Sequence, residues 1–183
     1  MGVIRETEPV KLVCGAIGVD REAVTAAEAA MSARYGAIDL ESDWIPFEFT
    51  DYYEPEMGSG LVRRFFSFAE LIDPAGLPGA KRLADEIEKQ HAVVRNGVRC
   101  RRVNLDPGYV APSKLVLAST KDFSHRIYLG GGIYAEVTLN FHRDGLTFFE
   151  WTFPDFRSGA YTPFLLEVRR RLMRRAGHLP RPA

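Results

Sequence analysis

Polar side chains between Arg101 and His142 include the residue types best suited to binding or reacting with a small molecule. These cations, carboxylates, amide and phenol lie in short apolar segments that proline and glycine interrupt. Such side chains destabilise a fold unless they pair or face water, so their concentration in one stretch indicates a site. The members of this polar cluster are Arg102, Asn104, Asp106, Tyr109, Lys114, Lys121, His125, Arg126 and Glu136.

Three cations and a histidine of the polar cluster form a candidate anion-binding group. They are Lys114, Lys121, His125 and Arg126. A guanidinium can bind a phosphate or carboxylate through two parallel hydrogen bonds. We predict a short helix over residues 114–120, and the free amides at its start would add donors. A solvated basic face is the alternative.

Glu136 and His125 are the candidate catalytic residues, because carboxylates and imidazoles are the usual proton acceptors in enzymes. Each has a structural alternative. Glu136 can form a salt bridge with Arg64, Arg102 or Arg126, and His125 can lie at the surface or cap a helix. A metal-ligand role for Glu136 also stays open.

The segment Asn104-Leu105-Asp106-Pro107-Gly108-Tyr109 predicts a tight turn at the end of a strand. Asp before Pro is typical of turns, and Gly tolerates positive φ. The functional alternative is a binding edge, since Asn104 and Asp106 alternate onto one face of the strand together with Arg102.

The segment from Asp39 to Glu56 contains seven acidic residues and no Lys or Arg. Asp51, Glu54 and Glu56 carry oxygen atoms of the kind that bind Mg²⁺ or Ca²⁺, but their spacing is not that of an EF-hand loop. We therefore favour a solvated acidic loop. No metal site is predicted, and no cofactor is indicated.

Residues 63–68 (RRFFSF) partly match the aromatic strand of an RNA-recognition module. Phe replaces the first glycine of that pattern, and Phe66 and Phe68 share a face with Arg64 while Phe65 lies opposite. We expect part of this set to be core, and nucleic-acid binding is disfavoured.

Hydrophobic periodicity predicts the order strand, helix, strand, strand, helix, strand in the first half of the chain. This order is typical of a ferredoxin-like split βαβ core, an α+β fold with an antiparallel sheet and helices on one face. The predicted elements cover residues 11–19, 21–35, 44–49, 61–68, 78–91 and 98–105.

The second half predicts a hairpin and a C-terminal helix that extend this core. Residues 126–129 and 133–141 flank a Gly-Gly-Gly turn, and residues 133–141 alternate regularly between two faces. A further hairpin turn is expected at residues 143–145. A final helix begins at Ser158 or Thr162 and ends near Ala176.

Composition sets the remaining limits. The chain has 183 residues, is 46% hydrophobic and carries zero net charge, which fits one domain over residues 9–176 with flexible tails at 1–8 and 177–183. No apolar stretch approaches the roughly 20 residues that span a bilayer, so no membrane interaction is expected. The N-terminus lacks the apolar core of a signal peptide, so a cytoplasmic location is expected.

Cys14 and Cys100 are expected to be buried thiols, and a disulfide between them stays open.

Four motifs resemble those of domain-of-unknown-function family 4416, a prokaryotic family. They are FTDYYEPEMG (49–58), RRVNLDPGYV (101–110), SKLVLASTKDFSHRIYLGGGIYAEVTL (113–139) and WTFPDFRS (151–158). The resemblance covers about residues 9–172 and implies no particular reaction or catalytic residue.

Members of that family often carry a GTP-binding label, and the residues argue against a P-loop GTPase. Such an enzyme needs G-x-x-x-x-G-K-[ST], whose amides surround the phosphates. Here Ile133 and Tyr134 follow the Gly-Gly-Gly run, and the base-reading N-K-x-D string is missing.

The sequence therefore predicts a small-molecule-binding protein or enzyme with a site for an anionic, phosphate- or carboxylate-bearing ligand, such as a nucleotide. The alternative is a non-catalytic module that binds another protein. A concave pocket with mutually bonded charges would favour the first function, and a flat apolar patch would favour the second.

Overall fold

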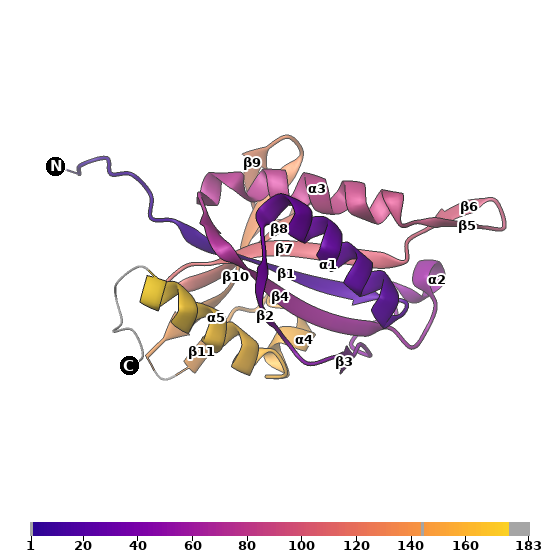
Figure 1. Cartoon of the computed structure of the whole chain (residues 1–183). Helices are drawn as coiled ribbons and strands as arrows, with labels where there is room; N and C mark the ends of the chain where they lie inside the picture. The colour runs from indigo at the N-terminus through magenta and orange to yellow at the C-terminus, as the bar shows by residue number, and fades with distance from the viewer. Residues whose placement is uncertain (1, 144, 176–183) are drawn as a thin grey trace.

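The computed structural model describes residues 2–143 and 145–175, which form an α+β fold built around one large antiparallel sheet (Figure 1). Asp144, Ala176 and the predicted tail at 177–183 lie outside the described residues. The strand order is β11-β10-β8-β7-β1-β4-β2, with β3 beside β4 and β9 beside β10. The sheet contains β1 (Val10–Gly18), β2 (Ile38–Glu41), β3 (Ile45–Pro46), β4 (Val62–Ile72), β7 (Val103–Val110), β8 (Lys114–Ser119), β9 (Ile127–Gly130), β10 (Ile133–His142) and β11 (Gly145–Phe148).

Helices cover both faces of the sheet, and Figure 1 shows them above and below it. We call the two sides the α1–α3 face and the α5 face. The helices are α1 (Arg21–Tyr35), α2 (Glu54–Met57), the 3-10 turn η1 (Pro74–Gly76), α3 (Leu77–Gln90), α4 (Pro154–Arg157) and α5 (Thr162–Arg175). A separate hairpin, β5 (Val93–Arg95) and β6 (Val98–Cys100), projects from the end of α3.

The central strand β1 is buried along its whole length because it packs on both layers. Leu12, Cys14 and Ala16 point to the α1–α3 face, and Val13 points to the α5 face. Strands buried on both sides read as continuous apolar runs. That pattern predicts β1 correctly.

The helix predicted at residues 114–120 is wrong, because this segment is strand β8. Leu115 and Leu117 pack on the α5 face, whereas Val116 and Ala118 pack on the other. A short apolar run with both faces buried shows no alternation between apolar and polar residues. Periodicity alone therefore cannot separate a strand from a helix here.

The turn predicted at Asp106-Pro107-Gly108 is also wrong, because β7 continues through it and pairs with β1. The backbone N–H and C=O of Leu105 face away from β1 and bond side chains of α3. Residues two apart in a strand face the same side, so the backbone of Pro107 also faces away from β1. Proline is tolerated at such a position if no partner strand needs its amide. On that side β8 pairs only with Gly108–Val110, so no ladder donor is lost at Pro107.

The regular alternation predicted for residues 133–141 is interrupted by a register shift between Val137 and Leu139. Ile133 therefore packs on the α1–α3 face, while Leu139 and Phe141 pack on the α5 face. A bulge of this kind moves every later side chain of the strand to the opposite face of the sheet.

Other boundaries differ by a few residues. The predicted strand at 98–105 is divided between β6 and β7, and the predicted strand at 44–49 is reduced to the two residues of β3. Strand β2 and the single turn of α2 were not predicted. The hairpin of β9 and β10 and the helices α1, α3 and α5 match their predictions closely.

We predict that Gly108→Ala destabilises the fold, because the added methyl would lie 2.4 Å from the carbonyl oxygen of Val116. Backbone cannot yield as a side chain can, so the expected loss is about 1–3 kcal/mol in the free energy of unfolding. Urea denaturation measures it. Gly79→Ala in α3 is the control, since nothing lies within 4 Å of its added methyl. That variant should be unchanged or more stable.

A second prediction concerns Glu28 of α1, which is 4% exposed and 3.4 Å from the Arg64 guanidinium. Burial raises its pKa to about 7, against the opposing effect of Arg64. The folded state therefore retains this proton to higher pH than the unfolded chain, and stability falls as pH rises from about 4.5 to about 7.

Glu28→Gln should remove this loss and raise stability at pH 8 by up to ~3 kcal/mol, with little change at pH 4. Urea unfolding at several pH values tests this expectation. The same substitution at exposed Glu86 of α3 is the control and should leave the pH profile unaltered. An unchanged profile in Glu28→Gln would contradict the assignment.

Candidate functional site

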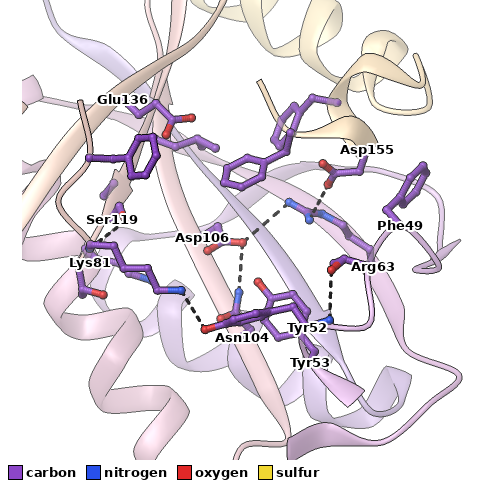
Figure 2. Close-up of a pocket in the computed structure, with 18 of the residues that line it drawn as sticks. Phe49, Tyr52, Tyr53, Arg63, Lys81, Asn104, Asp106, Ser119, Glu136 and Asp155 are labelled. Carbon is purple, nitrogen blue, oxygen red and sulfur yellow. Dashed lines mark hydrogen bonds and ion pairs between the residues drawn. The ribbon is translucent and has the colours of Figure 1, made fainter. Parts of the chain in front are cut away.

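A cavity of about 690 Å³ opens where β7 and β8 separate (Figure 2). Its floor comes from β4, β7, β8 and β10, and its walls come from α3, α4 and the loops that neighbour them. The charged and amide side chains that line it are Arg63, Lys81, Asp85, Glu88, Arg101, Asn104, Asp106, Lys121, Asp122, Arg126, Glu136 and Asp155. The aromatic side chains are Phe47, Phe49, Tyr52, Tyr53, Phe123, Phe153 and Phe156.

Side chains of α3 satisfy the edge of β7 that β8 leaves open. Lys81 Nζ donates to the carbonyl of Leu105 at 2.7 Å, and Glu88 Oε1 accepts from its amide at 2.7 Å. Burial raises the pKa of Glu88, partly offset by Lys81. The two strands can therefore separate without an unpaired buried backbone group at Leu105.

Arg63 of β4 lies on the floor of the cavity and is 4% exposed. Its guanidinium is 2.8 Å from Asp155 and 3.9 Å from Asp106 (Figure 2). Burial opposes its charge, yet Asp155 and the groups around it outweigh burial and raise the pKa of Arg63. Tyr161 donates a hydrogen bond of 3.1 Å to Asp155.

Aromatic rings enclose the same guanidinium at 4.7–5.5 Å from its central carbon. These rings belong to Phe47, Phe65, Phe156 and Tyr161. Gly15 of β1 leaves the space, because a methyl group there would lie 2.9 Å from the Arg63 side chain. The rings add cation–π attraction to the ion pairs.

Asp106 projects from β7 into the middle of the cavity (Figure 2). Asn104 donates to its Oδ2 at 3.1 Å, and Arg101 donates to Asn104 at 2.8 Å. Arg101 is itself held by Glu56 at 2.7 Å and Glu88 at 3.5 Å. These bonds fix one edge of the floor.

Glu136 of β10 orients Arg126, which forms the basic wall of the cavity together with Lys121. Its Oε2 is 2.9 Å from both Arg126 Nε and His125 Nε2, and its side chain is 3% exposed. Arg126 also donates to Ser119 Oγ and to the carbonyl of Lys121, each at 3.0 Å. The salt bridge that the sequence offered as the alternative role of Glu136 is therefore present, with Arg126 as the partner.

His125 is held from a second side as well. Its ring stacks on Trp151 at 5.0 Å between centroids and 8° between planes. The Trp151 indole donates to the carbonyl of Val137 at 2.9 Å, beside the bulge in β10.

Lys121 and the rings near it form the mouth of the cavity. Lys121 Nζ donates to the Tyr52 hydroxyl at 2.9 Å and lies 4.5 Å from that ring. Tyr52, Phe123 and Phe153 are 59%, 63% and 46% exposed, so apolar surface surrounds an exposed ammonium group.

The structure brings together most of the residues that the sequence selected. Asn104, Asp106, Lys121, Arg126 and Glu136 all line the cavity, and His125 contacts it through Glu136.

Three selected residues lie elsewhere. Arg102 pairs with the helix-capping Asp20 at 2.9 Å, outside the cavity. Tyr109 packs beside Leu77 on the α1–α3 face. Lys114 begins β8, seven positions before Lys121, and does not line the cavity. The predicted helix had placed it beside the other cations, and the strand separates them.

Sequence reasoning missed Arg63, Lys81, Arg101 and Asp155 as site residues. The available signal for Arg63 was the Arg63-Arg64 pair within a largely apolar strand. Asp155 contacts Arg63, whereas its near neighbour Arg157 binds backbone carbonyls. Predicting the contact with Arg63 would need knowledge that the C-terminal segment folds back on β4.

Three further observations concern metal ligands, aromatic rings and helix length. Within the described residues, no group of three or more His, Cys, Asp or Glu side chains could hold a metal ion. Phe65, Phe66 and Phe68 are at most 2% exposed, so these rings are not available to stack on bases. None of the described helices is long and apolar enough to cross a bilayer.

The four motifs quoted from the sequence supply most of the residues that line this cavity. A model of the family described as a domain of unknown function, DUF4416, matches residues 8–172. The chain belongs to this family. This match confirms the resemblance drawn from the four motifs. Comparisons with curated proteins and with solved structures gave no match.

We predict that Arg63→Met destabilises the DUF4416 domain by about 3–5 kcal/mol, because it leaves the Asp155 carboxylate buried without its cation. Urea denaturation measures the loss, and adding Asp155→Asn should restore part of it. Arg99→Met on β6 is the matched control, since Arg99 is exposed, and it should change stability by less than about 0.5 kcal/mol. Equal effects at both arginines would contradict this account.

Proposed function

We propose that the cavity binds a small organic anion carrying a phosphate or carboxylate, such as a nucleotide. The observation that carries this proposal is the basic wall, where Lys121 and Arg126 line a concave space of about 690 Å³. Ligand pockets commonly measure roughly 300–1,000 Å³. The charges of the cavity are bonded to one another, which is the arrangement that favours a small-molecule site over a flat protein-docking patch.

The two cations of the basic wall differ in what holds them. Glu136, Ser119 and a backbone carbonyl fix Arg126 in place. Lys121 contacts only a neutral hydroxyl among the described side chains, so its positive charge has no carboxylate partner. A bound anion would supply that partner, and the fixed guanidinium would bind it with little loss of side-chain freedom.

A proton-transfer role for His125 and Glu136 stays a prediction. Glu136 Oε2 and His125 Nε2 are directed at each other, 2.9 Å apart. In this arrangement the pair acts first as a support for Arg126.

We also propose that β1, α1, β2, β4, α3 and β7 form a ferredoxin-like core. The strand order β7-β1-β4-β2 with antiparallel neighbours supports it. A cytoplasmic location is proposed as well. Both cysteines are free thiols, which suits a reducing compartment.

A thermal-shift screen of nucleotides, sugar phosphates and carboxylates tests the anion site. A ligand at about one hundred times its Kd adds roughly 2.7 kcal/mol, or on the order of 5–10 °C for a domain of this size. We expect Lys121→Ala to abolish the shift, because this exposed ammonium supplies uncompensated charge without supporting the fold.

Lys114→Ala is the matched control, since this lysine of β8 lies outside the cavity. It should keep the full shift. Arg126→Ala should also lose the shift, with lower intrinsic stability because it leaves Glu136 short of a partner. No shift across the whole panel, or an undiminished shift in Lys121→Ala, would refute the anion site.

A further inference from the structure

Asp106 differs from the three buried carboxylates that line the cavity or support its walls. Its side chain is 30% exposed, compared with 3% for Glu136, 5% for Asp155 and 8% for Glu88. The three buried carboxylates each have a cation or backbone amide within 3 Å. Asp106 is therefore the accessible acid of the cavity floor, whereas the other accessible acids, Asp85 and Asp122, belong to the walls.

The contacts of Asp106 occupy only one of its two oxygens. Asn104 donates to Oδ2 at 3.1 Å, and Arg63 approaches the same atom at 3.9 Å. Among the described residues, no hydrogen bond reaches Oδ1. An ionised carboxylate accepts several hydrogen bonds, so Asp106 keeps acceptor capacity on the side that the cavity exposes.

A negative group at this position opposes the binding of a simple anion. The repulsion is offset only if the ligand donates a hydrogen bond to Asp106 while its own anionic group contacts Lys121 and Arg126. A site that pairs a buried polar group with a ligand donor strongly rejects analogues that lack the donor. Asp106 is thus placed to select one class of anion.

The size and lining of the cavity agree with such a two-ended ligand. About 690 Å³ is far more than one phosphate group occupies. Phe49, Tyr52 and Tyr53 also line the cavity (Figure 2), where they can contact a carbon skeleton or ring.

We propose that Asp106 accepts a hydrogen bond from a hydroxyl or amino group of the ligand, so that the cavity takes hydroxylated or amino-substituted organic phosphates or carboxylates. This inference rests on the proposed anion site and adds the chemical class of its ligand.

Calorimetric titration with two matched probes tests it. Ribitol 5-phosphate and pentyl phosphate share a linear carbon chain and a phosphate and differ only in hydroxyl groups. The wild-type domain should bind ribitol 5-phosphate at least about tenfold more tightly, the size expected of a hydrogen bond to a charged group.

Asp106→Asn should change the two affinities in opposite directions. Ribitol 5-phosphate should bind about tenfold more weakly because it loses a charged acceptor. Pentyl phosphate should bind equally well or more tightly because a repulsive charge is removed. Asp122→Asn is the control, since it removes the same charge from an exposed position on the same cavity. It should preserve the preference for ribitol 5-phosphate.

A shift of both probes in the same direction in Asp106→Asn, or the same result in Asp122→Asn, would overturn the role of Asp106. If other anions bind in a Lys121-dependent manner but neither probe does, the ligand class is wrong and the anion site stands. If no anion binds, both proposals fail.

Discussion

The buried Arg63 guanidinium is the interaction on which the rest of the structure depends. Removing such an ion from water costs several kcal/mol, and an ion pair in good geometry must offset that cost. The partner, Asp155, comes from α4, more than ninety residues away in the chain. Gly15 leaves the space for the guanidinium and four rings enclose it. The C-terminal segment must therefore close over the α5 face before this charge is neutralised, which links folding of the sheet to formation of the cavity.

A second constraint is the separation of β7 from β8. Continuous pairing of the two strands would fill the space that the cavity occupies. Gly108 lets them approach closely at one end, and beyond it Pro107 offers no amide hydrogen that a partner strand would need. Lys81 and Glu88 of α3 then bond the exposed edge at Leu105. The Asp-Pro-Gly segment thus has a role opposite to the one its composition suggests, because it ends the pairing of two strands without turning the chain.

Local sequence patterns predict some elements of this fold and fail at others. Periodicity predicts β1, α1 and α3, since the two helices each bury one face and β1 is continuously apolar. Asp106, Arg126 and Glu136 of the polar cluster line one cavity in the structure. Local patterns could not reveal the bulge in β10, the strand conformation of β8 or the contact between Arg63 and Asp155. All three depend on which face a distant segment covers, and periodicity in one segment carries no such information.

Most charges of the cavity serve to hold other charges in place. Arg101 is bound by Glu56 and Glu88, Arg126 by Glu136, and Arg63 by Asp155. Each pair is at least partly buried, so the geometry of the walls is fixed before any ligand arrives. Lys121 and Asp106 are left with unused capacity and opposite signs. A cavity lined by nearly equal numbers of acids and bases can therefore still discriminate, because recognition depends on groups that the network leaves open, such as Lys121 and Asp106. The zero net charge of the chain is consistent with this arrangement, in which selectivity arises from local placement and the overall field contributes little.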